Sequence, residues 1–291
     1  HLTHIDLTMD GFTSQLTGEV DLLNWPEQTY RIVKSDIELP PMKDIFFAED
    51  NFTVTGDASF IGSWHIFDGG RDLTGTFESE NATLNDLGFP ALKGDLVWTR
   101  DRFEVFKTRS GFYGGTLDID YSMKPLGTNL PGWATLDTRY HEVDVSTLLD
   151  VFEIGGVRPE GQAGGRNLLR WPLGSFSDYT GEGELLVEPD PDVRLMTRTA
   201  LNKGPAGPDS YGSVPFAFDS GPWHFPVGGR VSYELDSKWI EIGLSRIATP
   251  YTEIEFHGRT AYGNESNIPF RVTSADWQES DRLMVAFMTA F

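Results

Sequence analysis

The fold is decided by residues 52–121, where four phrases begin with glycine: GDASF at Gly56, GTFES at Gly75, GDLVW at Gly94 and GTLDIDY at Gly115. The phrases are spaced 19, 19 and 21 residues apart. That spacing is close to two strands of seven or eight residues plus two short turns, so it predicts an antiparallel meander. Glycine at each predicted strand start supplies a turn or bend that a residue with a Cβ resists.

Within this stretch apolar and acidic residues alternate. Side chains two positions apart on a strand share one face, so the sheet is predicted to have a dry face and a wet, acidic face. An ordinary antiparallel sandwich with similar turns would show the same alternation and remains an alternative. The apolar positions are Leu96, Trp98, Phe103, Val105, Leu117, Ile119 and Tyr121, and the acidic positions are Asp95, Glu104, Asp118 and Asp120.

The composition indicates a folded, β-rich protein. The chain has 291 residues, of which 39% are hydrophobic and 13% aromatic, with 31 glycines and 17 prolines, as many short strands and turns require. No Ser/Gly linker divides it. We therefore expect one continuous body over residues 1–291, with sub-blocks 1–48, 49–154 and 155–291. Because the chain begins at His1 without a methionine, we expect it to be a segment of a longer protein.

The charge and the cysteine count exclude several classes of function. The formal net charge is −21, which repels phosphate backbones and disfavours binding to nucleic acid or to an anionic leaflet. There is no cysteine, so disulfides, zinc–thiolate sites and thiol catalysis are excluded. No run of about 18 apolar residues is present, and the sequence predicts no membrane-spanning helix.

A strand followed by a short helix occurs twice, 106 residues apart. The first copy is IELPPMKDIFF from Ile37 and the second is VDVSTLLDVFE from Val143. An internal repeat at fixed spacing indicates a repeated structural unit. In the second copy Ser146 is predicted to cap the helix. The matched positions are Ile37, Leu39, Met42, Asp44, Ile45 and Phe46 with Val143, Val145, Leu148, Asp150, Val151 and Phe152.

The remaining segments continue the pattern of strands and end in a helix. Residues 202–213 are predicted to form a loop. From residue 274 to 291 the apolar period becomes helical, with Trp277, Met284, Phe287, Met288 and Phe291 on one side. Further strands are predicted at residues 2–8, 16–23, 29–39, 182–187, 227–235, 239–244, 252–256 and 270–273.

Catalytic motifs are not found. The six histidines are dispersed without the spacing of a metal site, and no nucleophile elbow, P-loop or dinucleotide-binding glycine pattern occurs. Carboxylates at positions i and i+2 lie about 6.5–7 Å apart on a strand, which overlaps the separation used in glycoside hydrolysis. Several equivalent pairs occur, however, as any acidic strand face would produce. We predict a protein that is not an enzyme and has no metal or cofactor.

The glycine-led strands, the two strand–helix phrases and the segment GFYGGTLDIDY resemble the AsmA-like superfamily, and within it the TamB-type chains. The runs GQAGGRNLLRWPLGSFSDYTGEGELLVEP and TSADWQESDRLMVAFMTAF are also similar to that type. The resemblance touches most of residues 16–291. It implies a mainly β fold: a long, twisted, solenoid-like antiparallel meander, bent like a taco around a hydrophobic groove, with a few short helices.

The same resemblance implies a periplasmic protein of the bacterial cell envelope. Its expected function is phospholipid transport between the inner and outer membranes, or outer-membrane protein assembly, and its expected partners are phospholipid acyl chains and an outer-membrane barrel protein. The chain departs from the family pattern because the inner-membrane helix is missing. The residues that we expect to line the lipid groove are Phe60, Phe77, Trp98, Phe103, Val105, Leu117 and Ile119.

Two other functions remain open from the sequence. The first is a structural envelope spacer in which these apolar residues fill a core. The second is an extracellular carbohydrate-binding β-sandwich, suggested by eight tryptophans, nine tyrosines and an acidic surface. The carbohydrate hypothesis predicts exposed, coplanar aromatic rings on the wet face.

Overall fold

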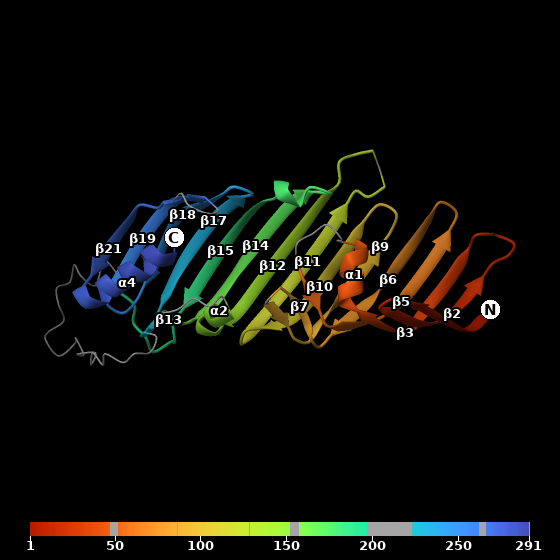
Figure 1. Ribbon diagram of the computed structural model, residues 1–291, viewed down its shortest axis with the longest axis horizontal. Coiled ribbons are helices and arrows are strands. Elements are labelled where there is room, and N and C mark those ends of the chain that lie inside the picture. Colours follow the sequence, from red (N-terminus) through yellow and green to blue (C-terminus); the bar gives the residue numbers. More distant parts are fainter. Residues whose placement is uncertain are drawn as a thin grey trace. The chain divides into compact units, whose positions relative to one another are not determined.

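The computed structural model is mainly β, with short helices (Figure 1). It describes residues 1–46, 52–85, 87–127, 129–151, 157–196, 223–261 and 266–290. The predicted loop at 202–213 and the positions Phe152 and Phe291 lie outside these ranges, as do the side chains of Met284, Phe287 and Met288.

The elements are given in the order in which they follow one another along the chain. The strands of the first half are β1 (Leu2–Met9), β2 (Phe12–Val20), β3 (Gln28–Glu38), β4 (Val54–Thr55), β5 (Asp57–Phe67), β6 (Gly70–Ser79), β7 (Ala82–Leu84), β8 (Leu87–Phe89), β9 (Leu92–Trp98), β10 (Phe103–Phe112), β11 (Gly115–Lys124) and β12 (Trp133–Asp144). Those of the second half are β13 (Val157–Glu160), β14 (Gln162–Pro172), β15 (Thr180–Glu188), β16 (Trp223–Pro226), β17 (Gly228–Asp236), β18 (Trp239–Ala248), β19 (Thr252–Ala261), β20 (Ser266–Asn267) and β21 (Phe270–Ser274). The helices are α1 (Leu39–Phe46), α2 (Val145–Val151), a 3-10 turn η1 (Phe176–Asp178) and α4 (Trp277–Ala290).

Most strands pair with their neighbours in sequence. In the part of the chain that is described, a 16-stranded sheet has the order β1-β2-β3-β5-β6-β9-β10-β11-β12-β14-β15-β17-β18-β19-β20, and β21 also pairs with β19. The short strands stand apart from this order, as a β4-β7-β8 sheet and a parallel β13-β16 pair. The predicted long antiparallel meander is thereby confirmed.

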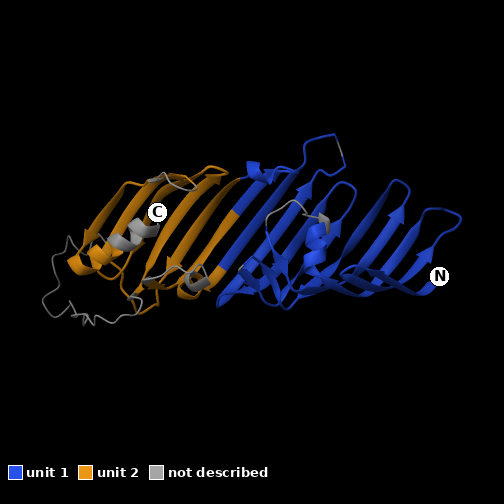
Figure 2. Ribbon diagram, in the orientation of Figure 1, with its two compact units in different colours: residues 1–140, 168–179 blue, residues 141–167, 180–291 orange. Residues whose placement is uncertain are grey.

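The chain divides into two compact units, coloured separately in Figure 2. Unit 1 comprises residues 1–140 and 168–179, and unit 2 comprises residues 141–167 and 180–291. The predicted strands of both units are present. The β2–β3 turn departs from the prediction, because it includes residues 21–23, which were expected to extend a strand.

The strand registers of unit 1 confirm the two predicted faces. Phe103 pairs with Trp98, and Val105 pairs with both Leu96 and Tyr121, so these side chains share one face. The same face continues through the Phe60–Phe77 and Leu16–Ile32 pairs, which belong to a cluster around Leu16, Ile32 and Phe60. We call this surface the apolar face of unit 1.

The sequence predicted that each of the four glycines begins a strand, but two of them lie inside strands. Gly75 lies in the middle of β6, opposite Gly62 of β5, and Gly94 lies inside β9. A Cβ on Gly75 would lie 2.2 Å from the carbonyl oxygen of Ile61 and 2.5 Å from the ring of Phe60. The β5 and β6 backbones therefore approach more closely than side chains would permit, and Phe60 folds over the glycine pair.

Both strand–helix phrases have the predicted form. β3 ends at Glu38 and α1 begins at Leu39, and β12 ends at Asp144 and α2 begins at Val145. These boundaries are related by the same shift of 106 residues that relates the two sequences. The predicted cap was wrong, because the Oδ1 atom of Asp144 accepts the Thr147 amide at 2.6 Å. Asp144 is the last strand residue, so it reaches the free amides of the first turn from outside the helix.

Both strand–helix units are closed by a backbone hydrogen bond that the sequence did not indicate. The first amide of α1, from Leu39, donates to the Gly56 carbonyl at 3.0 Å, and that of α2, from Val145, donates to the Gly161 carbonyl at 3.1 Å. Each glycine directly precedes the next long strand of the sheet, β5 or β14. The repeated unit is therefore a strand, a helix, a short strand outside the main sheet, and a glycine that ties the helix start to the returning strand.

Unit 2 has the more completely packed core. Phe225, Val227, Ile242, Ile254 and Phe256 are buried together with Leu283 of α4. Phe256 is only 1% exposed. Helix α4 therefore packs against the apolar residues of β16–β19.

We predict that Gly75→Ala destabilises the protein by about 2–3 kcal/mol, because the new methyl group would overlap the Ile61 carbonyl and the backbone must shift. The measurement is the midpoint of denaturant unfolding followed by tryptophan fluorescence. Gly88→Ala is the control, since a Cβ at Gly88 meets nothing within 4 Å. Equal midpoints for the two variants would contradict the prediction.

Candidate functional site

The apolar face of unit 1 carries all seven residues that the sequence predicted as a lipid groove. Phe60 and Leu117 are buried, at 7% and 6% exposure. The other five are only half-buried and come from four neighbouring strands, β6, β9, β10 and β11. The registers bring Phe60 to Phe77 and Trp98 to Phe103, whereas Leu117 and Ile119 lie opposite Ser110 and Thr108. The half-buried residues are Phe77, Trp98, Phe103, Val105 and Ile119.

The two ends of this face differ in burial. At the end where α1 begins, which we call the helix end, small side chains are almost fully buried, including Ser35 at 1% and Ser110 at 2% exposure. The opposite end, which we call the turn end, holds the turns β2–β3, β5–β6 and β9–β10, because the intervening strands are antiparallel. Large aromatic side chains gather there.

A row of aromatic rings follows the turn end. Trp98, Phe103 and Tyr121 are neighbours with ring centroids 6.2 Å apart at each step. The row continues to Trp171 at 6.1 Å and then through Phe176 to Tyr179. Successive rings are tilted or edge to face, with interplanar angles between 31° and 88°. Such contacts add to the stability of the face beyond the burial of area.

The row of aromatic rings passes over β12, a strand that contributes no ring to it. Tyr121 lies on β11 and Trp171 on β14, and β12 runs between them, so their backbones are about 9.5 Å apart. The two rings nevertheless approach to 6.1 Å. Antiparallel extension from the Leu173–Gly132 hydrogen bond places Ala134, which is 0% exposed, opposite Trp171. A small residue on β12 lets the rings lean toward each other. Trp171 lies about 50 residues from Tyr121 in the chain, so no local pattern in the sequence indicates this contact.

Two arginines stand beside this row at the turn end. The Arg71 guanidinium carbon lies 6.0 Å from the centre of the Trp98 ring, a cation–π geometry. Arg100 donates from Nη1 to the Gly69 carbonyl, at 3.2 Å, in the β5–β6 turn. Both side chains are exposed. Neither arginine was predicted as a site residue, because a single arginine carries no distinctive signal in the sequence.

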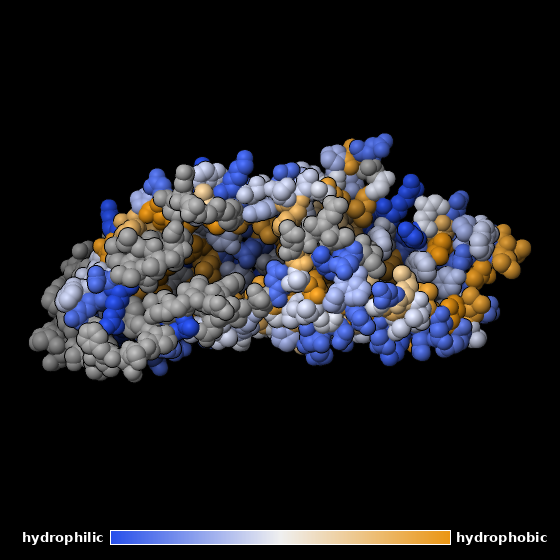
Figure 3. Space-filling view, in the orientation of Figure 1, coloured by the Kyte–Doolittle hydropathy of each residue, from blue (hydrophilic) through white to orange (hydrophobic). Residues whose placement is uncertain are grey.

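The β2–β3 turn projects large apolar side chains into solvent at the same end. Leu22, Leu23 and Trp25 are 79%, 95% and 66% exposed. The turn is nevertheless ordered by its polar residues, since Asp21 Oδ1 accepts the amides of Leu23 and Asn24 at 2.9 and 3.2 Å. In Figure 3, hydrophobic residues are visible at this turn, beside β2. The run DLLNW in the sequence could have signalled it, because apolar residues are unusual at a turn.

The opposite face of unit 1 carries the acidic residues in cross-strand ion pairs. Lys107 pairs with Asp95 at 3.2 Å, Lys124 with Glu104 at 2.9 Å, and Arg109 approaches Asp118 at 3.8 Å. Asp120, the partner of Asp118 in an i, i+2 pair, lies 3.8 Å from Arg139. These carboxylates therefore belong to a solvated ladder of charges on the sheet.

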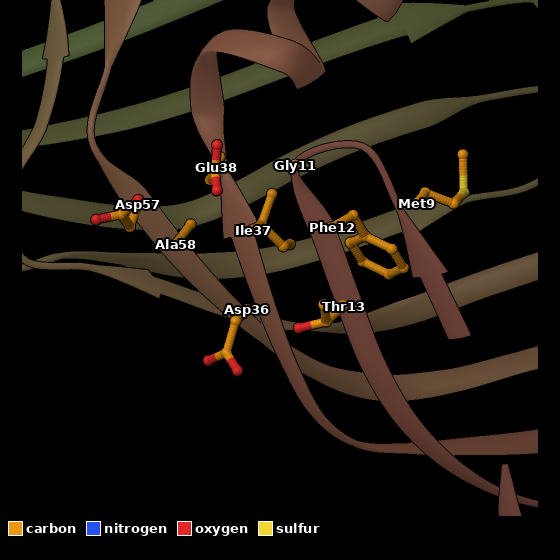
Figure 4. Close-up of a pocket in the computed structure, with 9 residues that line it drawn as sticks. All are labelled: Met9, Gly11, Phe12, Thr13, Asp36, Ile37, Glu38, Asp57 and Ala58. Carbon is orange, nitrogen blue, oxygen red and sulfur yellow. The ribbon is translucent and has the colours of Figure 1, made fainter. Parts of the chain in front are cut away.

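A cavity of about 450 Å³ lies at the helix end of β1, β2, β3 and β5 (Figure 4). Met9, Phe12 and Ile37 contribute apolar atoms. The carboxylates of Asp36 and Asp57 also line it, and Lys34 pairs with Asp36 at 2.8 Å. The other lining residues include Thr13 and Glu38, and none of these described side chains belongs to a group that could hold a metal ion.

A buried carboxylate fastens α4 in unit 2. Glu279 is 7% exposed, and its Oε2 atom accepts the Thr252 hydroxyl at 2.9 Å. Asp276 caps the helix, accepting the Gln278 amide at 2.9 Å. Burial raises the pKa of Glu279, against the hydrogen bonds from Thr249 and Thr252 that lower it. The site holds the first turn of α4 against the β18–β19 turn.

We predict that Glu279→Gln removes a pH dependence of stability. Because the folded pKa of Glu279 is raised, its contribution is fully present below the ordinary carboxyl pKa and is lost as pH rises through the folded value. The wild type should therefore lose stability relative to the variant as pH rises from 3 to 7. The melting temperature of the variant should increase relative to that of the wild type over this range. A difference between the two proteins that is constant over this range would contradict the assignment.

Neither a metal site nor a membrane-spanning helix is found in the described ranges. No group of three or more His, Asp or Glu side chains there could hold a metal ion. None of the helices described is long and apolar enough to cross a membrane. No family model, curated protein or solved structure matches the chain.

Proposed function

We propose that the chain is a non-enzymatic segment of a bacterial envelope protein whose apolar face carries phospholipid acyl chains. On this proposal it serves lipid passage between the inner and outer membranes, with outer-membrane protein assembly as a related role. The single observation that supports it most is the half-buried state of the apolar face of unit 1. Five of the seven candidate groove residues keep part of their surface exposed although they lie in the middle of a sheet.

The physical argument starts from the sheet itself. Side chains of one face can be removed from water only by a second layer or by a ligand. Each methylene that an acyl chain buries against this face contributes ~0.8 kcal/mol. Neighbouring strands offer similar apolar surfaces, so a chain could move from one to the next without any chemical step. The opposite face carries ion pairs, and these charged groups favour contact with water.

The sequence resemblance to the AsmA-like superfamily supports the same proposal and supplies its setting. TamB and its relatives are linked to phospholipid passage and to outer-membrane protein assembly in the periplasm. The repeated strand–helix unit and the long meander are what the resemblance implies for the fold. Periplasmic location and an outer-membrane barrel partner belong to the proposal on this basis alone.

The two alternatives make different demands on the aromatic residues. A carbohydrate-binding surface requires coplanar rings on the wet face, whereas Trp98, Phe103, Tyr121 and Trp171 are tilted and Trp98 and Phe103 lie on the apolar face. A spacer with a filled core requires buried side chains throughout, as in unit 2 around Phe256. The half-buried row in unit 1 favours an acyl ligand over both.

We predict that Phe103→Asp lowers the phospholipid that copurifies with the protein by about tenfold, because an ionised carboxylate against an acyl chain costs more than ~1.4 kcal/mol. The measurement is native purification from a bacterial envelope, lipid extraction and mass spectrometry. Ile61→Asp is the matched control: Ile61 is 53% exposed and lies beside Phe60 on the other face of β5.

Circular dichroism must show the same fold in both variants. A wild-type protein that is free of lipid would refute the transport proposal and favour the spacer. Equal lipid loss in the Phe103 and Ile61 variants would show that the apolar face is not the binding surface.

We predict that the exposed β2–β3 turn assists uptake of lipid from a membrane. Replacing Leu22 and Leu23 by serine should slow transfer of a fluorescent phospholipid from vesicles to the protein by about tenfold, because apolar surface that would enter the bilayer is removed. Leu244→Ser is the control, since Leu244 is 81% exposed but lies in unit 2. Unchanged transfer rates in the turn variant would exclude this role.

A further inference from the structure

We infer that Arg71 and Arg100 form a phosphate site for the headgroup of a phospholipid whose acyl chains lie on the apolar face of unit 1. The inference rests on the proposed function and gives it an orientation, with the headgroup at the turn end. Its first support is the strand register.

Both arginines lie at the turn end of β6 and β9. Leu73 of β6 pairs with Trp98, the last residue of β9, so Arg71 lies two residues from this pair in β6 and Arg100 lies two residues beyond it, in the β9–β10 turn. Arg71 also pairs with Ile66 in the register that joins Trp64 to Leu73, so it belongs to the apolar face. Its guanidinium lies over Trp98, and Arg100 reaches the Gly69 carbonyl two residues before Arg71. Both cations therefore flank the same short turn.

Neither arginine is paired with a carboxylate in the part of the chain that is described. The chain has 44 carboxylate residues against 23 lysines and arginines, so an arginine without an acidic partner is unexpected. In the described ranges, no carboxylate oxygen lies within 4.0 Å of either guanidinium. The nearest acidic residue in sequence, Asp101, is engaged by the Thr99 hydroxyl at 2.6 Å. Asp72 belongs to the other face of β6, opposite His65.

Two guanidinium groups beside the same turn repel each other, and an anion bound between them would remove this cost. Guanidinium groups match the oxygens of a phosphate in a bidentate arrangement, and the charge-assisted bonds are stronger than neutral ones. A phosphodiester also fits the surroundings, since one side of the site is aromatic and leads onto the apolar face. A free inorganic phosphate would make no use of Trp98, Leu73 or Leu96.

The proposed ligand is therefore an intact diacyl phospholipid, bound with its phosphate between Arg71 and Arg100. Its chains extend from the turn end along β6 and β9, over Leu73, Leu96 and Phe77. The exposed β2–β3 turn lies at the same end. A lipid that enters from a bilayer at this end would insert its acyl chains first, and its headgroup would stay at the turn end.

The test compares binding of two fluorescent ligands that share acyl chains, phosphatidylethanolamine and diacylglycerol, to the wild type and to the double variant Arg71→Gln, Arg100→Gln. We expect the variant to lose about tenfold or more in affinity for the phospholipid and to keep its affinity for diacylglycerol, which has no phosphate. The control is Arg31→Gln. Arg31 is an exposed arginine of β3 on the opposite face.

The outcomes separate the two proposals. A wild type that binds neither ligand refutes the proposed function. Equal affinity of the wild type and the double variant for the phospholipid, with diacylglycerol bound, overturns the arginine site alone. Equal loss in the Arg31 variant would reduce the effect to net charge and would also overturn it. Competition by millimolar inorganic phosphate at the same level as by phospholipid would identify a free-anion site instead.

Discussion

The rest of the structure depends on one constraint: a sheet that is apolar on one side must keep that side from water. In unit 2, α4 and the strands β16–β19 meet this constraint with an ordinary core around Phe256, which is 1% exposed. In unit 1 the side chains of β6, β9, β10 and β11 meet it only in part, since most remain half-buried. The same polypeptide therefore contains a filled and a partly open version of one architecture.

Close backbone approach makes this arrangement possible. The Gly62–Gly75 pair lets β5 and β6 lie against each other beneath Phe60, and buried Ala134 lets Tyr121 and Trp171 meet over β12. Small residues at these points leave the space that the large aromatic residues beside them occupy. A repeated device, the helix amide bonded to Gly56 or Gly161, ties each strand–helix unit to the strand that follows.

The charged residues on the opposite face of unit 1 differ in their pairing from those at its turn end. On the opposite face of unit 1 the acidic side chains are paired across strands with Lys107, Lys124 and Arg139. At the turn end, Arg71 and Arg100 have no carboxylate partner among the described residues, and Leu22, Leu23 and Trp25 project outward. The turn end of unit 1 therefore holds both exposed cations and exposed apolar side chains.

The meander, the two faces from Leu96 to Tyr121 and the repeated strand–helix phrases could be predicted from the sequence, because period-two alternation and helix boundaries are set by residues close in the chain. The prediction misplaced Gly75 and Gly94, chose Ser146 instead of Asp144 as the cap, and did not reveal the aromatic row, the arginine pair or the exposed turn. Those features depend on which strands lie side by side and in what register. The contact of Trp171 with Tyr121 and the reach of Arg100 to the Gly69 carbonyl follow from the tertiary structure, since pairing over long sequence separations is fixed by packing and hydrogen bonding of the whole sheet.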